Sequence, residues 1–197
     1  MFVKVNLSMK SKNILNYSQP DFYKFSRDSI ELAQIAAELE SENKELNVLE
    51  VFSGCGVVSL EFLSRHNSIS NLCFIEEQKD FSSHFLSNIS DLKIPYEIHW
   101  GNFKEVEMTK KFDVILLNPP YFDPASSRLG ENEKRNHCRF ALNFTLLELL
   151  NFLEQRLLEN GRAYICHSDD LCKLDKRIER IGSFQEVGLF RFQLNVD

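Results

Sequence analysis

The sequence predicts an α/β protein in which helices cover both faces of a mostly parallel β-sheet, with a short helical extension at the N-terminus. From residue 47 onward, short apolar runs alternate with amphipathic segments, which is the pattern of strand–helix repeats. The runs are apolar almost throughout, as expected for strands that are buried on both faces. Glycines and polar side chains follow several of these runs, at the edge where open parallel sheets bind their ligands.

The individual elements follow from the same alternation. Strands are expected at 47–52, 71–76, 96–101, 112–118 and 162–168, and helices at 57–66, 79–92 and 140–161. The last of these helices is expected to end with Gly161 as its C-cap. The alternating segment 185–196 is expected to form one or two edge strands.

A further helix is expected ahead of the first strand, over residues 28–40. Asp28 can cap it, and Glu31 three residues later completes a capping-box pattern. We therefore expect residues 1–45 to form an N-terminal segment whose helix packs on the core, and residues 46–197 to form the main domain.

Composition indicates an ordinary soluble protein, with 43% hydrophobic and 26% charged residues among 197. No apolar run approaches the roughly 20 residues of a membrane span, and the N-terminus lacks the features of a secretory signal. The five cysteines form no CxxC pair, so we expect reduced thiols in a cytoplasmic protein and no metal site.

The formal net charge of −6 argues against an extensive nucleic-acid surface. Basic residues are nevertheless concentrated in two segments, 1–27 and 128–139. An acidic protein with two such segments can hold a polynucleotide locally. The same residues can equally be ordinary solvated charges.

The turn after the first strand has the sequence "EVFSGCG", which begins with Glu50 and carries glycines at 54 and 56. Gly54 and Gly56 would let the backbone approach a ligand closely, where any Cβ would obstruct it. Ser59 stands where the third glycine of a GxGxxG motif would be, and no GK[ST] is present. A nucleotide without a pyrophosphate is therefore the expected ligand.

Polar residues also follow the second and third strands. Glu76 ends the second strand, 22 residues beyond Gly54, and is placed to accept hydrogen bonds from both hydroxyls of a ribose. It could instead interact with the dipole of the following helix, a role that Glu77 fits as well. Asn102 follows the third strand, either beside an adenine or as a simple turn residue.

The fourth strand ends in Asn118, Pro119, Pro120 and Tyr121, in the stretch "FDVILLNPPYFDP". The two prolines lack backbone donors, so neither extends a sheet ladder. An amide and a phenol are thus held on a rigid piece of backbone beyond the strand.

In this order, the motifs resemble those of Rossmann-like S-adenosylmethionine-dependent methyltransferases of the NPPY subclass. "YSQPDFYKFSRDSIELAQ" and "KRNHCRFALNFTLLELL" are most similar to the bacterial adenine-specific enzymes that act on the transfer RNA for valine. Two positions depart from the pattern: Phe52 replaces a glycine, and Asn102 replaces an aspartate. Cytosine carbon-5 chemistry is excluded, because no proline here precedes the cysteine that it needs.

The resemblance implies S-adenosyl-L-methionine as cofactor and RNA, above all tRNA, as partner. Glu50, Gly54, Gly56, Glu76, Asn102 and Asn118 would hold the cofactor. The Asn118 oxygen and the Pro119 carbonyl would accept hydrogen bonds from an adenine amino group, with Pro120 fixing their direction and Tyr121 stacking on the base.

Neighbouring residues would add to these contacts. Phe122 either adds to the aromatic face or packs inward, and packing is favoured. Phosphates would meet the basic side chains after the motif, which are Arg128, Lys134, Arg135 and Arg139. Tyr23, Phe25 and Asp28 would form a lid, although Phe25 also suits the core and Asp28 the helix cap.

Two other functions fit the same motifs. A protein glutamine methyltransferase would present a side-chain amide to the same acceptors, but such enzymes carry a substantial N-terminal domain, and only about 45 residues precede the first strand. A non-catalytic nucleic-acid-binding protein could also retain this fold, as Phe52, Asn102 and the acidic charge allow.

Overall fold

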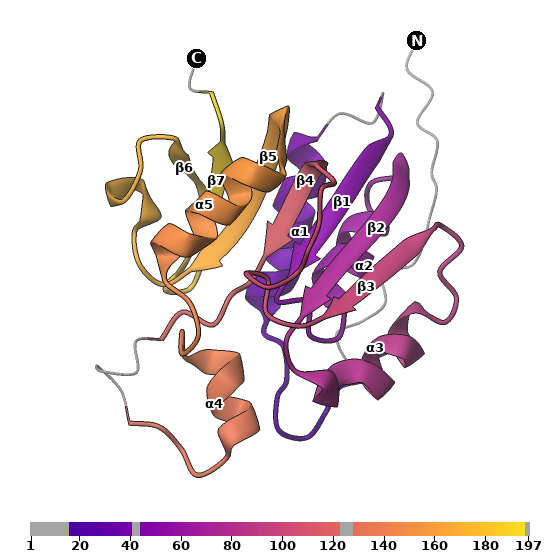
Figure 1. The fold of residues 1–197 in the computed structure, drawn as a ribbon, viewed down its shortest axis with the longest axis vertical. Helices are drawn as coiled ribbons and strands as arrows, with labels where there is room; N and C mark the ends of the chain where they lie inside the picture. The colour runs from indigo at the N-terminus through magenta and orange to yellow at the C-terminus, as the bar shows by residue number, and fades with distance from the viewer. Residues whose placement is uncertain (1–15, 41–43, 123–127, 196–197) are drawn as a thin grey trace.

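The computed structural model describes residues 16–40, 44–122 and 128–195 (Figure 1). Seven strands in this part of the chain form one sheet in the order β3-β2-β1-β4-β5-β7-β6. Their bounds are β1 Leu46–Val51, β2 Ile69–Glu76, β3 Tyr96–Trp100, β4 Phe112–Leu117, β5 Leu157–His167, β6 Ile178–Phe184 and β7 Val187–Gln193. The first five run parallel, and β7 is antiparallel to both β5 and β6. The predicted α/β class is confirmed.

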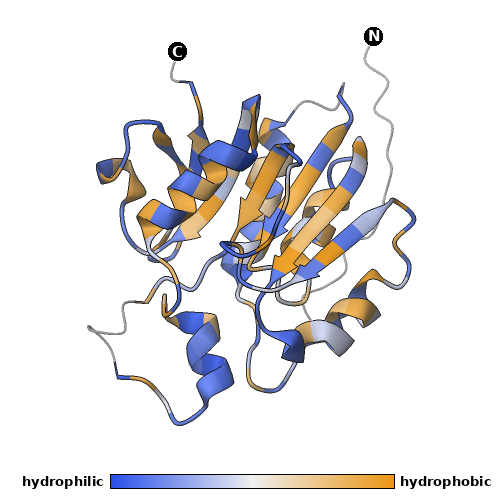
Figure 2. Cartoon of the chain, in the orientation of Figure 1, coloured by the Kyte–Doolittle hydropathy of each residue, from blue (hydrophilic) through white to orange (hydrophobic). Residues whose placement is uncertain are grey.

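Helices cover both faces of this sheet, as expected. The helices are α1 Arg27–Leu39, α2 Val57–Leu63, α3 Ser82–Ile89, α4 Glu133–Arg139 and α5 Leu146–Arg156, with short 3-10 turns at Lys79–Phe81 and Leu171–Lys173. One core cluster joins α1, α2 and α3 to one face, through residues such as Leu32, Phe62 and Phe85. The other joins α5 to the opposite face through Leu149 and Leu153. The strands are mainly apolar and α4 is mainly polar (Figure 2).

The parallel register brings the ends of β1, β2 and β4 to one edge of the sheet. Val51 lies opposite Ile75 on one side and opposite Leu117 on the other. The residues that follow these strands therefore meet in space although they are far apart in the sequence. In Figure 1 this edge faces α4, which lies beyond the arrowheads of the central strands.

The expected helix over 140–161 is wrong at both ends. Thr145 caps α5 through a full capping box with Glu148, and the helix stops at Arg156. Gly161 lies inside β5 and is not a C-cap. A Cβ at Gly161 would lie 2.7 Å from the carbonyl oxygen of Phe112, so the glycine permits close approach of β5 to β4. Pairing of Leu157 with Phe112 of β4 overrides the amphipathic helical pattern here.

Three other expectations need correction. Ser26 is the N-cap residue of α1, and Asp28 lies in the first turn of the helix, where its carboxylate accepts from the N–H of Ser29 at 2.7 Å. The expected capping box is therefore absent. The basic segment after the proline motif contains a helix, α4, that the sequence did not predict. Segment 185–196 supplies one inner strand, β7, and the edge strand β6 precedes it.

The α1 helix packs on the same core as α2 and β5, with Ala33 and Ala36 fully buried in the cluster. The proposed division at residue 45 stays a prediction. Within the described ranges, every helix is too short or too polar to traverse a lipid bilayer.

Candidate active site

The turn between β1 and α2 has an unusual backbone. Gly54 and Gly56 adopt positive φ angles of 50° and 75°, and Phe52 adopts 60°. A glycine accepts this left-handed conformation readily, whereas another residue is strained there. The Phe52 ring compensates through packing, with ring centroids 5.5 Å from Phe103 and 4.9 Å from Phe144. The turn thus keeps the shape of a glycine motif although Phe52 stands at one glycine position.

Glu76 lies at the end of β2 and is 6% exposed. One carboxylate oxygen accepts from the N–H of Gly54 and the other from the N–H of Gln78, both at 2.7 Å. Burial raises its pKa to about 7, and these two hydrogen bonds oppose the shift. Glu77, by contrast, is exposed and accepts from the side chain of Asn143 at 3.0 Å. Of the two neighbouring acids, only Glu76 is joined to the glycine turn.

Glu50 is the second buried acid, with 2% exposure near the end of β1. Its carboxylate accepts from the N–H of Ser59 in α2 at 2.9 Å. Burial raises its pKa to about 7 as well, and the charge of Glu76 adds to the shift. Glu50 therefore ties the end of β1 to the helix that follows the turn.

Asn118 follows the last residue of β4. Its Nδ2 donates to the hydroxyl oxygen of Ser29, in the first turn of α1, at 2.7 Å. Tyr121 is half-buried, and its ring centroid lies 5.7 Å from that of His167 at the end of β5. The proline motif therefore lies between the N-terminal helix and the carboxyl ends of β4 and β5.

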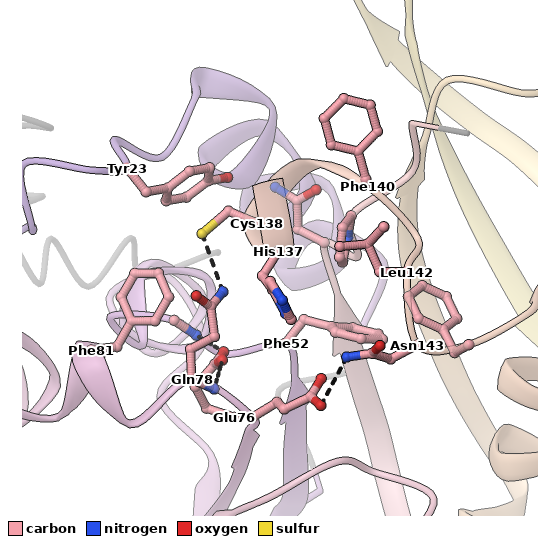
Figure 3. Close-up of a pocket in the computed structure, with 15 residues that line it drawn as sticks. Tyr23, Phe52, Glu76, Gln78, Phe81, His137, Cys138, Phe140, Leu142 and Asn143 are labelled. Carbon is pink, nitrogen blue, oxygen red and sulfur yellow. Dashed lines mark hydrogen bonds between the residues drawn. The ribbon is translucent and has the colours of Figure 1, made fainter. Parts of the chain in front are cut away.

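Two adjoining cavities meet at Asn118, which lines both together with Tyr23, Pro120 and Cys138. The first, the glycine-turn cavity, is also lined by Phe52, Gly54 and Glu76. Figure 3 shows that side chains from the segment before α1, the glycine turn, the end of β2 and α4 surround it. The second, the proline-loop cavity, is also lined by Asp28, Pro119 and Tyr121.

The basic residues expected at phosphates separate into two groups. Arg135 and Arg139 line the proline-loop cavity, and the Arg139 guanidinium lies 5.1 Å from the centroid of the Phe122 ring. Lys134 instead pairs with Asp80 at 2.5 Å and bridges α4 to the segment after β2. Arg128 is exposed. The structure thus brings only Arg135 and Arg139 to the predicted acceptor side.

Phe122 and Asn102 also had two alternative roles each. Phe122 is 37% exposed and lines the proline-loop cavity, so the favoured inward packing is wrong. Its backbone exchanges hydrogen bonds with Arg139 and Ala141, which hold it beside α4. The Asn102 side-chain oxygen accepts from the N–H of Lys104 at 3.0 Å, as a turn asparagine does. A cofactor contact by Asn102 stays a prediction.

Sequence reasoning missed several residues at the site. Gln78 lines the glycine-turn cavity beside Glu76, and Phe144 buttresses Phe52. Ser29 contacts Asn118 directly. The only sequence signal for Ser29 was its place next to Asp28, in the aromatic-rich entry to α1.

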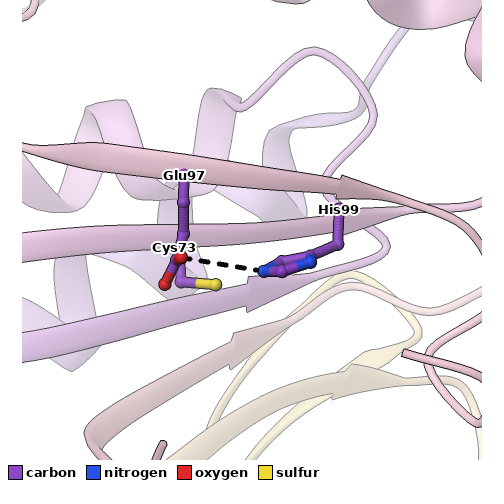
Figure 4. Close-up of side chains that lie close together, drawn as sticks. All are labelled: Cys73, Glu97 and His99. Carbon is purple, nitrogen blue, oxygen red and sulfur yellow. Dashed lines mark ion pairs between the residues drawn. The ribbon is translucent and has the colours of Figure 1, made fainter. Parts of the chain in front are cut away.

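A group of potential metal ligands lies elsewhere, on β2 and β3. One ligand atom each of Cys73, Glu97 and His99 lies within 4.8 Å of the others (Figure 4). The Glu97 carboxylate is already paired with Lys110 at 2.6 Å. Burial raises the pKa of the Cys73 thiol to about 12, which opposes the thiolate form that metals bind. Glu97 thus forms ion pairs with Lys110 and His99, and the absence of a metal stays a prediction.

The chain is similar in sequence to known methyltransferases. The family model described as Conserved hypothetical protein 95 matches residues 34–132, which is 99 of the 197 residues. A tRNA1(Val) (adenine(37)-N6)-methyltransferase of Pseudoalteromonas translucida is 29% identical over 129 residues, covering 65% of this chain and 53% of that protein. A release factor glutamine methyltransferase of Aliivibrio fischeri is 26% identical over 141 residues, covering 70% and 48%. The chain spans about half the length of these curated relatives.

Solved structures agree on the fold. A Pyrococcus horikoshii protein named as a candidate RNA methyltransferase superposes with a TM-score of 0.63 at 15% identity, covering 91% of this chain and 93% of that one. A ribosomal protein L11 methylase from Lactobacillus delbrueckii gives 0.58 at 16% identity, covering 86% and 80%. The fold is that of the class I S-adenosylmethionine-dependent methyltransferases.

Proposed function

The chain belongs to the Conserved hypothetical protein 95 family, and we propose that it transfers a methyl group from S-adenosylmethionine to the exocyclic amino group of adenine in RNA, with tRNA as the favoured substrate. The observation that carries the proposal is the position of Asn118. It lies where the two cavities meet, and its Nδ2 donates a hydrogen bond to the Ser29 hydroxyl. Its oxygen is thereby available as an acceptor.

The glycine-turn cavity fits the cofactor. Gly54 lines it with a positive φ and no side chain, so its backbone can approach a ligand closely, and Phe52 adds an apolar face. Each Glu76 oxygen accepts one backbone N–H and has further lone pairs for the hydroxyls of a ribose. S-adenosylmethionine, when bound, would supply an electrophilic methyl group on a positively charged sulfur.

The proline motif fits the acceptor amine. The lone pair of an adenine amino group is delocalised into the ring, so the nitrogen is a poor nucleophile. Hydrogen bonds accepted by the Asn118 oxygen and the Pro119 carbonyl favour a pyramidal nitrogen, whose lone pair can form the new N–C bond as the S–C bond breaks and its electron pair stays on sulfur. One amine proton then leaves to water.

The proline-loop cavity supports a nucleobase as the acceptor. Tyr121 offers a π-face, a contact worth about 1–3 kcal/mol for a stacked base. Arg135 and Arg139 lie on the same cavity and could meet phosphates on either side of the base. An adenine enters such a cavity from an unpaired loop or after flipping out of a helix. The curated tRNA relatives act on adenine, which is consistent with this geometry.

A protein glutamine amide is the second candidate, supported by the similarity to the release factor enzyme. It presents the same NH₂ group, so Asn118 and Pro119 would serve it equally. The two substrates differ in what surrounds the reacting nitrogen. A stacked base needs Tyr121 and gains from Arg135 and Arg139, whereas a flexible glutamine side chain does not need a stacking face.

The test is transfer of tritium from labelled S-adenosylmethionine to total tRNA, ribosomal RNA, DNA and lysate protein in parallel. Label recovered as N6-methyladenine from RNA would support the proposal, and label in protein would move it to glutamine. Silence in every pool, with a folded protein, would overturn both and favour a non-catalytic binding role.

Asn118→Ala gives the test its residue-level readout. We expect transfer to fall by about 10²- to 10³-fold, as for loss of one preorganised hydrogen-bonding group, while cofactor affinity stays within about twofold because the cofactor is held mainly from the glycine turn and Glu76. Asn151→Ala, at an exposed position on α5, is the matched control. A large loss of cofactor affinity in Asn118→Ala would show that its role is misassigned.

A further inference from the structure

We propose that Ser29 is a positioning residue for methyl transfer, which holds the Asn118 amide with its oxygen turned toward the acceptor amine. This inference rests on the function proposed above and deepens it. It assigns part of the active site to the N-terminal helix, 89 positions away from Asn118 in the sequence.

The contact itself is short and joins a half-buried asparagine to a buried serine. Asn118 Nδ2 donates to Ser29 Oγ at 2.7 Å, and Ser29 is 3% exposed. A helical serine can give its own hydroxyl hydrogen to a carbonyl one turn back, which leaves its oxygen free to accept. The serine oxygen is therefore suited to receive the amide N–H.

The first turn of α1 fixes Ser29 in this place. Its N–H is shared between the carbonyl oxygen of Ser26 at 3.3 Å and the carboxylate of Asp28 at 2.7 Å. Asp28 also accepts from the Ser26 hydroxyl, and its carbonyl oxygen lies 3.7 Å from the sulfur of Cys166 on β5. The turn is thus tied both to itself and to the sheet.

The direction of the amide matters because its two ends have opposite roles. With Nδ2 on Ser29, the Asn118 oxygen remains as the acceptor for an amine hydrogen. If the amide rotated by half a turn, its NH₂ group would face the NH₂ group of the substrate. Two donors would then face each other, and no hydrogen bond could form. An alanine at position 29 would leave Nδ2 without this acceptor and the amide free to rotate.

The experiment compares the wild-type protein with Ser29→Ala, Ser29→Thr and Ser64→Ala. The Thr variant keeps a hydroxyl at the same place. The Ser64→Ala variant removes the C-cap serine of α2, whose hydroxyl donates to the carbonyl of Glu61 at 2.8 Å, away from both cavities. For each protein, kcat and KM are measured on the RNA that the wild type methylates, together with the dissociation constant for S-adenosylhomocysteine.

We expect Ser29→Ala to lower kcat by about 10- to 100-fold, the range set by one buried hydrogen bond. KM and cofactor affinity should stay within about threefold, because substrate and cofactor touch other groups. Ser29→Thr should restore most of kcat, and Ser64→Ala should match the wild type. In NMR spectra, the Asn118 side-chain amide should exchange slowly with solvent in the wild type and rapidly in Ser29→Ala.

The outcomes separate this inference from the proposed function. An active wild type whose Ser29→Ala variant keeps kcat and slow amide exchange would overturn the role of Ser29 and leave the proposed function standing. A wild type that methylates no substrate would overturn the proposed function, and the positioning role with it. A fall in kcat matched by an equal loss of cofactor affinity would show general damage to the site and overturn the positioning role.

Discussion

If Glu76 holds the ribose of the cofactor as proposed, its buried carboxylate should make cofactor binding sensitive to pH in a predictable direction. Its pKa of about 7 means that roughly one tenth of the groups are ionised at pH 6 and about nine tenths at pH 8. Ribose hydroxyls donate to the ionised form more strongly than to the protonated form. If only the ionised form binds, affinity for S-adenosylmethionine should rise about tenfold from pH 6 to pH 8.

Glu76→Gln removes the charge and keeps the shape. The new NH₂ group must also face one of two donors, the N–H of Gly54 or that of Gln78. Loss of charge-assisted hydrogen bonds costs about 1.5–3 kcal/mol, which corresponds to a 10- to 150-fold rise in the dissociation constant at pH 8. The variant should also lose the pH dependence.

Isothermal titration calorimetry with S-adenosylhomocysteine at pH 6, 7 and 8 measures both effects. Glu77→Gln tests the neighbouring exposed acid and should resemble the wild type. Glu50→Gln is needed as a second control because Glu50 has the same raised pKa. If the pH dependence of cofactor affinity disappears in Glu50→Gln and not in Glu76→Gln, it arises from Glu50. A wild-type affinity that is flat from pH 6 to pH 8, or a Glu76→Gln affinity within twofold of it, would refute the reasoning.

Two further predictions concern stability. The pKa of Glu50 is raised from 4.5 to about 7 on folding, so its contribution to stability is present below pH 4.5 and is lost as pH rises through 7. Between pH 6 and 8 this loss is about 1 kcal/mol, and urea unfolding should show that Glu50→Gln loses less stability over this interval, whereas equal losses would contradict the assignment. Gly161→Ala should cost about 1–3 kcal/mol, because its Cβ would meet the Phe112 carbonyl at 2.7 Å. A Cβ added at Gly101 has no neighbouring atom within 4 Å, so Gly101→Ala should keep the wild-type melting temperature. Equal melting temperatures for the two variants would show that the Gly161 contact with β4 does not contribute to stability.

The sequence by itself determined the parallel strands of the sheet and the convergence of its main motifs. Alternating apolar runs predict parallel strands, and parallel strands end at a common edge. Glu50, the glycine turn, Glu76 and Asn118 each fall at or next to the end of such a strand, so their proximity required no knowledge of side-chain packing. The left-handed backbone of the glycine turn is likewise a local property, although Phe52 shows that aromatic packing can maintain it without glycine at every position.

Tertiary structure decided the features that depend on distant partners. Leu157 pairs with Phe112 of β4, and the register shifts before Arg162 pairs with Val114, so residues 157–161 belong to β5 although the local pattern continues a helix. The docking of α4 brings Arg135 and Arg139 to the proline-loop cavity while Lys134 pairs with Asp80. Ser29 reaches Asn118 only because α1 packs on one face of the sheet with its first turn beside the end of β4. Periodicity reports which face of an element is buried, but it carries no information about which distant side chain that face will meet.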